Sequence, residues 1–102
     1  MSRARRWLVA AALALAAASS PAADLERGAQ VYGRHCAKCH GTSGMSMWPG
    51  APNLARREGL MKPDMAIAEV LRKGRGPKPG YQGVLSDADM LNVIAYARTL
   101  AR

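Results

Sequence analysis

The chain has 102 residues, enough for one small domain, and its 15 basic and 7 acidic side chains give a formal net charge of +8. Without the three arginines among its first six residues the net charge is +5, so the remaining basic side chains still outnumber the acids. This balance favours an acidic protein partner or an anionic surface, and the chain carries no motif typical of nucleic-acid binding.

Residues 1–23 have the composition of an export signal. Arg3, Arg5 and Arg6 form a basic start, an apolar run follows, and small residues suited to cleavage end the segment. The apolar run is short for a membrane span, although an uncleaved anchor remains an alternative. We therefore expect a signal peptide at 1–23, one domain at 24–102, and a periplasmic protein without stable membrane insertion.

A first helix is expected from Asp24 to His35. Residues suited to a packed face recur there at spacings of three and four: Leu25, Gly28, Val31 and Tyr32. The helix leads directly into the residues that carry the chemistry of the chain.

Residues 36–40 read Cys-Ala-Lys-Cys-His, which is the spacing of a c-type haem attachment site. Two thiols separated by two residues can add to the two vinyl groups of one porphyrin, and the adjacent histidine can bind the iron as its proximal ligand. We therefore expect one covalent haem c, with its iron, held by Cys36, Cys39 and His40.

Three other kinds of site use a similar pair of cysteines. A thioredoxin-like redox pair normally accompanies a strand–helix–strand pattern, and the sequence shows no convincing strand. Zinc normally takes four ligands from two separated pairs, whereas His35, Cys36, Cys39 and His40 are crowded into six residues. A disulfide across so short a loop would add little stability. Haem attachment is the favoured interpretation.

A second helix is expected from Asp64, which can cap it, to Lys73, with Gly74 ending it. Three apolar residues share its predicted buried face: Ile67, Val70 and Leu71. The segments on either side, 41–60 and 74–85, are rich in glycine and proline and are expected to be irregular.

A third helix is expected from Ser86 to about Leu100. Ser86 and Asp89 have the spacing of a capping box. One apolar stripe is predicted to face the core, with Leu91 and Leu100 beside it: Met90, Ile94 and Ala97. With three helices and no clear strand, the domain is expected to be all-α.

These features together resemble a class I c-type cytochrome with one haem, over nearly all of residues 24–102. In that family a glycine and an aromatic residue of the first helix pack against an aromatic residue of the last helix, here Gly28, Tyr32 and Tyr96. A Pro-Asn-Leu element follows the haem motif, here at 52–54, and the resemblance implies that a carbonyl near Pro52 accepts a hydrogen bond from His40. The implied fold has three main helices and irregular loops wrapped around haem c.

The chain departs from the family at the sixth iron ligand. The family places a methionine in a Gly-x-Gly-x-Met-Pro-x-aromatic context before the last helix, whereas residues 74–81 here read GRGPKPGY. Lys78 stands at the methionine position. It is the first candidate for the distal ligand and would bind iron as a neutral amine.

Two alternatives for the distal side stay open. A methionine from elsewhere could reach the iron: Met45 and Met47 follow the haem motif, and Met61 and Met65 flank the start of the second helix. The distal position could also be open to small ligands such as oxygen or carbon monoxide. Methionine ligation raises the reduction potential of a haem, and a harder amine donor would lower it.

The leading functional hypothesis is a periplasmic electron carrier, not an enzyme, that passes one electron through haem c. Four cations lie in segments expected to border the exposed haem edge, where they could dock an acidic redox partner: Arg34, Lys38, Arg75 and Lys78. The alternatives are a ligand-binding or sensing haem protein with an open iron site, and a haem subunit of a larger exported oxidoreductase.

Overall fold

The computed structural model describes residues 23–76 and 78–102, and of Lys78 it describes the backbone only. The predicted signal peptide at 1–23 lies outside the described residues except for its last residue. Within the described part, no helix is long and apolar enough to cross a membrane.

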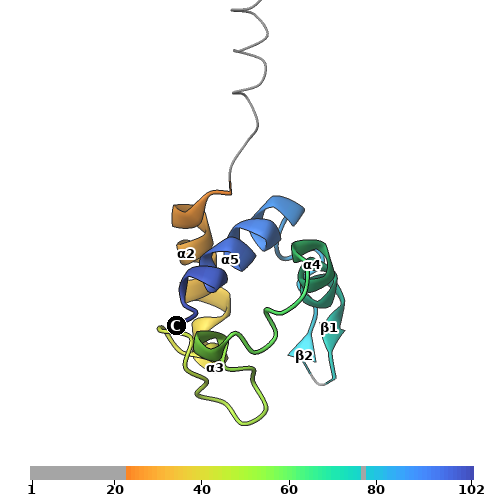
Figure 1. Ribbon diagram of the computed structural model, residues 1–102. Coiled ribbons are helices and arrows are strands. Elements are labelled where there is room, and N and C mark those ends of the chain that lie inside the picture. The colour runs from red at the N-terminus through yellow and green to blue at the C-terminus, as the bar shows by residue number, and fades with distance from the viewer. Residues whose placement is uncertain (1–22, 77) are drawn as a thin grey trace, which may run out of the picture.

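The protein is mostly helical, as the all-α expectation requires (Figure 1). Its elements in chain order are α2 (Leu25–His35), α3 (Ala37–His40), η1 (Leu54–Arg56), α4 (Asp64–Lys73), β1 (Gly74–Arg75), β2 (Lys78–Pro79) and α5 (Asp87–Thr99).

Helices α2 and α5 cross in close backbone contact (Figure 1). A Cβ atom at Gly28 would lie far inside van der Waals contact with the Asn92 carbonyl, so this approach requires glycine. The Tyr32 and Tyr96 rings meet nearby, with centroids 5.4 Å apart and planes tilted by 53°. The predicted packing of Gly28, Tyr32 and Tyr96 is confirmed.

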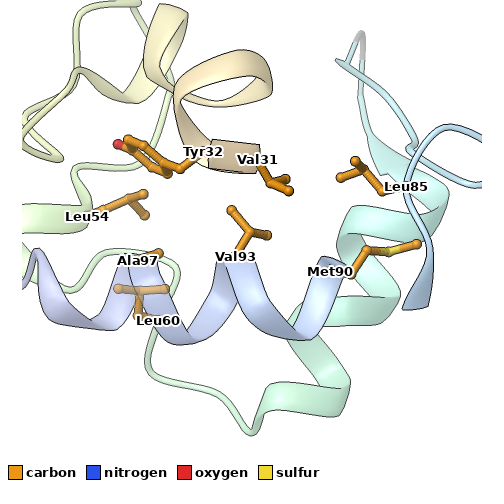
Figure 2. Packing of buried hydrophobic residues seen from close by; sticks show 8 residues of the cluster. All are labelled: Val31, Tyr32, Leu54, Leu60, Leu85, Met90, Val93 and Ala97. Atoms are coloured by element: carbon orange, nitrogen blue, oxygen red, sulfur yellow. The ribbon is translucent and has the colours of Figure 1, made fainter. Parts of the chain in front are cut away.

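The hydrophobic core lies between these two helices and is completed by the connecting segments. Figure 2 shows eight of its side chains pointing toward one another: Val31, Tyr32, Leu54, Leu60, Leu85, Met90, Val93 and Ala97. Met90 is 1% exposed, which confirms its predicted place in the core, and burying a side chain of this size contributes about 1.5–3 kcal/mol. Val93, absent from the predicted stripe, is also buried because it lies three residues from Met90 on the same helix face.

Side chains cap α2 and α5 at their first turns. Asp24 Oδ1 accepts a hydrogen bond from the Arg27 amide at 2.9 Å, and Ser86 Oγ accepts one from the Asp89 amide at 3.0 Å. The Asp89 carboxylate does not return to Ser86. It accepts hydrogen bonds from the Arg27 guanidinium instead, which forms an ion pair between α2 and α5. Of the predicted capping box, only the bond from the Asp89 amide to Ser86 Oγ is therefore present.

The start of α4 differs from the prediction. Pro63, not Asp64, occupies the N-cap, because the Pro63 carbonyl accepts the first helical hydrogen bonds. The Asp64 carboxylate is bound by Arg98 of α5. At the other end, Gly74 closes the helix with φ of +81°, as predicted.

Helix α4 buries little of its surface. Ala68 is its one fully buried residue, and Ile67 and Leu71 are partly buried against the core. Val70 is exposed, so the predicted inclusion of Val70 in a buried face is wrong. The face that α4 presents to the core is therefore narrower than its sequence pattern indicates.

Short regular elements interrupt the segments expected to be irregular. The 3-10 helix η1 lies within 41–60, and β1 and β2 form an antiparallel hairpin that pairs Gly74 with Pro79 and Arg75 with Lys78. Strands of two residues are too short to leave an alternating sequence pattern, which explains why none was expected. In Figure 1 the hairpin continues directly from the end of α4.

Candidate haem attachment site

Helix α2 leads almost directly into the cysteine motif. The Cys36 amide donates to the Tyr32 carbonyl at 2.9 Å, and in the next turn, α3, the His40 amide donates to the Cys36 carbonyl at 3.0 Å. Residues three and four apart lie on one side of such a turn, so Cys36, Cys39 and His40 share a side of α3. Both cysteines are partly exposed and His40 is buried.

His40 is oriented by the backbone of the Pro-Asn-Leu element. Its Nδ1 lies 2.9 Å from the Pro52 carbonyl oxygen, the contact that the family resemblance implies. A carbonyl can only accept a hydrogen bond, so Nδ1 carries the proton and, in the neutral imidazole, Nε2 keeps its lone pair. This tautomer gives His40 the donor atom that haem iron requires.

The loop after the motif folds back onto it. The Cys39 carbonyl accepts hydrogen bonds from the Met47 amide at 2.8 Å and the Trp48 amide at 3.2 Å. Gly41 makes the reversal possible, with φ of +79° and no room for a Cβ beside the Met45 carbonyl. The Tyr32 hydroxyl donates to the Gly41 carbonyl and secures the same turn from α2.

The side chains of this loop are directed outward although its backbone is held. Ser46 Oγ bonds the Ala51 carbonyl at 2.8 Å, while Met45, Met47 and Trp48 are exposed. Large apolar side chains are therefore exposed in the segment that directly follows the attachment motif.

Tyr81 anchors the segment after the hairpin to the end of α2. Its hydroxyl donates to the His35 carbonyl at 3.1 Å, and the two rings meet edge to face with centroids 5.8 Å apart. No local sequence pattern predicts this contact, because Tyr81 and His35 are 46 positions apart. The contact brings the chain just after Lys78 beside the attachment motif.

Two tyrosines near the motif stay neutral over a wide pH range. Burial, and secondarily the Cys36 charge, raises the pKa of Tyr32 to about 12. Burial also raises the pKa of Tyr81, with smaller contributions from Cys36 and Cys39. Neither phenol is suited to act as a general base at neutral pH, which agrees with a site for binding a redox group.

The alternative readings of the cysteine pair find no support in this geometry. Among residues 23–76 and 78–102, no three His, Cys, Asp or Glu side chains are grouped to hold a metal ion. The four crowded zinc candidates of the motif therefore do not converge. Cys36 and Cys39 are not joined in a disulfide.

The candidate distal ligands are distributed over three segments. Met45 and Met47 lie in the exposed loop after the motif. Lys78 lies in β2, paired with Arg75, and its side chain is outside the described part of the chain. Met61 and Met65 flank the start of α4 and are 81% and 68% exposed.

Two groups of basic side chains differ in their ion pairing. Arg27, Arg72, Lys73 and Arg98 form ion pairs with acids on the outer surfaces of the helices. Arg34 and Lys38, which flank the motif, and Arg75 of the hairpin are exposed, and no ion pair to an acid is found for these three in the described residues. Arg34 and Lys38 therefore place two exposed positive charges next to the attachment motif in the sequence.

The donor chemistry fits covalent haem. Two thiols and one imidazole on one side of a helical turn are the groups that c-type attachment uses. Large apolar side chains stay exposed in segments 45–48 and 61–65, which suits a pocket for an apolar macrocycle.

Comparison with known proteins supports the same conclusion. Residues 23–96 match the family described as cytochrome C oxidase, cbb3-type, subunit III. The chain is 34% identical over 84 residues to cytochrome c6 of Picosynechococcus sp., covering 74% of this chain and 72% of that protein. It is 34% identical over 80 residues to cytochrome c6 of Euglena viridis, covering 72% of this chain and 90% of that protein.

Family membership rests on both the extent of these matches and the geometry of the motif. The matched residues include α2, the cysteine motif, the Pro-Asn-Leu element and most of α5. The chain thus belongs to this family of c-type cytochromes, as a monohaem electron-transfer protein that is not an enzyme and whose cofactor is covalently bound haem c.

Proposed function

We propose that the protein is an exported, periplasmic one-electron carrier whose haem c is attached through Cys36 and Cys39, with His40 as the proximal iron ligand. The observation that carries the proposal is the 2.9 Å contact between His40 Nδ1 and the Pro52 carbonyl. It selects the tautomer that can bind iron, and it does so next to two thiols at the required spacing.

The bound haem supplies reversible one-electron chemistry, between ferric and ferrous iron. The chain holds this group and limits its surroundings. Thioether bonds at Cys36 and Cys39 keep it from dissociating, and the Pro52 carbonyl fixes the His40 ring. The loop bonded to the Cys39 carbonyl carries Met47 and Trp48, whose exposed apolar side chains would be available to cover part of the haem.

On the distal side we propose Lys78 as the iron ligand. Its place in the family pattern supports this, and so does the Tyr81 contact to His35, which brings the adjacent chain beside the motif. Met61 and Met65 are weaker candidates, as are Met45 and Met47. An open iron site, suited to ligand binding or sensing, is the remaining alternative.

The optical spectrum of the haem-loaded protein, ferric and ferrous, with and without carbon monoxide, tests both sides of the haem. A low-spin spectrum that lacks the sulfur–iron charge-transfer band and does not respond to carbon monoxide is expected. The sulfur–iron band would assign the ligand to a methionine. A high-spin spectrum that shifts with carbon monoxide would replace the carrier by the ligand-binding alternative.

The attachment residues are tested in the same system. Replacing Cys36 and Cys39 by Ala should abolish covalent haem, measured by haem stain after denaturing electrophoresis. His40→Ala should retain some thioether-linked haem but lose the low-spin spectrum. Covalent haem in the double variant would refute the proposed attachment.

We propose that Arg34, Lys38, Arg75 and Lys78 dock an acidic redox partner. The exposed positions of Arg34, Lys38 and Arg75 support this, and within residues 23–76 and 78–102 no ion pair to an acid is found for these three. The rate of electron transfer to an acidic partner should fall as salt rises, and charge reversal at Arg34 should weaken that dependence. An electron-transfer rate that does not depend on salt would show that these residues do not take part in docking.

A second candidate function follows from the description of the matching family, which names an oxidase subunit. In that case the protein is the haem subunit of a larger exported oxidoreductase. Purification from the native host distinguishes the two: a shuttle elutes alone, and a subunit elutes with its complex.

A further inference from the structure

Arg98, in the last turn of α5, binds the segment that leads into α4. Its Nη1 donates to the Leu60 carbonyl at 2.9 Å and its Nη2 to the Lys62 carbonyl at 2.9 Å. Its Nε and Nη2 both reach Asp64 Oδ1, at 3.0 and 2.8 Å. One guanidinium therefore fixes three points within five residues. We call this set of contacts the Arg98 clamp.

Apolar packing is weak at this end of α4. Ala68 is the one fully buried residue of the helix. A hollow of about 260 Å³ lies beside the clamp, lined by Arg57, Leu60, Met61, Arg98 and Ala101. Charge-assisted hydrogen bonds are stronger than neutral ones, and a rigid guanidinium loses little freedom in making several at once. The clamp thus supplies an attachment that apolar contact does not.

The opposite end of α4 is tied to the start of α5 in a similar but lighter way. Arg72 Nη2 lies 3.1 Å from Asp87 Oδ1, and the Asp87 side chain is largely exposed. Solvent weakens an ion pair of this kind. Of the two arginine–aspartate tethers between α4 and α5, the clamp is the one that also holds backbone carbonyls.

The segment that follows the hairpin is bonded to the end of helix α4. The Tyr81 amide donates to the Leu71 carbonyl at 2.8 Å, and the Gln82 amide to the Arg72 carbonyl at 3.2 Å. Gly80 fits against the end of α4 so closely that a Cβ atom there would overlap its backbone. Whatever fixes α4 therefore also fixes the strand that carries Lys78.

We propose that Arg98 is a positioning residue for the distal side of the haem, because its clamp holds α4 and the attached hairpin against α5. The inference rests on the proposed function in one respect, the assignment of the hairpin to the distal side. A lysine at position 98 keeps the charge near Asp64 but cannot reach the carboxylate and both carbonyls together.

The test uses the haem-loaded protein and three variants: Arg98→Met, Arg98→Lys and, as control, Arg27→Met. Arg27 makes a two-point contact with Asp89 between α2 and α5, so its loss removes an arginine–aspartate pair without touching α4. Hydrogen exchange, followed by mass spectrometry, reports on residues 64–73 and 80–82 separately from α2.

In Arg98→Met the α4 amides should exchange about ten- to a hundred-fold faster than in the unaltered protein, with α2 unchanged. In Arg98→Lys the exchange rate of the α4 amides should lie between those of Arg98→Met and the unaltered protein. Arg27→Met should leave the α4 exchange rate unchanged. Carbon monoxide should bind faster to ferrous Arg98→Met, with a larger high-spin fraction in its ferric spectrum. Equal α4 exchange in Arg98→Met and Arg27→Met would overturn the proposal.

Two other outcomes separate this inference from the proposed function. Faster α4 exchange with an unchanged spectrum and carbon monoxide rate would overturn the positioning role, because α4 would then move without affecting the iron. A purified protein without covalent haem would overturn the proposed function, and the haem stain shows this before any variant is made.

Discussion

Helices α2 and α4 both pack against α5, but by different means. α2 meets α5 backbone to backbone at Gly28, with buried side chains around the crossing. α4 contributes one fully buried residue, Ala68, and is tied to α5 by Arg98 and Arg72. Close packing of buried side chains excludes water and resists deformation. Solvent screens the attraction within partly exposed ion pairs, so the helix that they hold separates more easily.

The two helices also carry different parts of the proposed haem site. The attachment motif continues from α2, so the cysteines and His40 belong to the tightly packed side. The hairpin with Lys78 continues from α4 and belongs to the weakly packed side. Local opening is therefore expected first at α4, with the attachment side intact.

The largest effect is expected where the two backbones touch. Gly28→Leu places a side chain where the Asn92 carbonyl already lies, so α2 and α5 cannot cross and folding should fail. Gly33→Ala is the matched control, since no atom lies within 4 Å of a Cβ there. It should stabilise α2 by about 0.5–1 kcal/mol. Yields of haem-loaded protein and thermal melts measure both, and normal yield from Gly28→Leu would contradict the close approach.

Truncating one apolar side chain on each helix compares a buried position of α5 with an exposed position of α4. Met90→Ala removes a fully buried side chain of α5 and should cost about 2–5 kcal/mol. Val70→Ala on α4 removes an exposed side chain and should cost less than about 1 kcal/mol. Denaturant unfolding of the haem-loaded variants gives both values. Similar losses would mean that α4 is packed as firmly as α5.

The sequence predicts the tightly packed side far better than the weakly packed one. Spacing alone placed α2 and α5, and the family resemblance anticipated the contact between His40 and Pro52. The contacts of Arg98 depend on how distant segments come together, since Arg98 and Asp64 are 34 positions apart and neither belongs to a local pattern. Val70 was misplaced for a related reason: periodicity shows that a helix has an apolar face but not how much of that face its neighbour covers.

The pH dependence of stability should differ between the buried phenol of Tyr32 and the partly buried phenol of Tyr81. Burial, then the Cys36 charge, raises the pKa of Tyr32 to about 12, so the folded state holds a proton that the unfolded state releases near pH 10. The stabilisation is therefore complete below pH 10 and is lost between about pH 10 and 12.

Its size is at most roughly 2–3 kcal/mol, because solvent screening lowers it and thioether formation at Cys36 removes that charge. Tyr32→Phe should flatten this part of the pH–stability curve, while Tyr81→Phe, on the α4 side, should change it less. Unfolding titrations of the haem-loaded protein from pH 9 to 12 measure the slopes, and an unchanged slope in Tyr32→Phe would assign the titration to another group.

The smallest effect is expected at the helix starts. Ser86→Ala removes the oxygen that accepts from the Asp89 amide and should cost about 1 kcal/mol, or roughly 4–8 °C in melting temperature. Ser86→Asn keeps an acceptor and should retain most of the stability. Helix α4 has no side-chain cap to lose, since Pro63 occupies that position. If Ser86→Ala speeds hydrogen exchange in the first turn of α5 but not in α4, the two helices open independently. If exchange becomes faster in both helices, the ion pairs of Arg72 and Arg98 couple their opening.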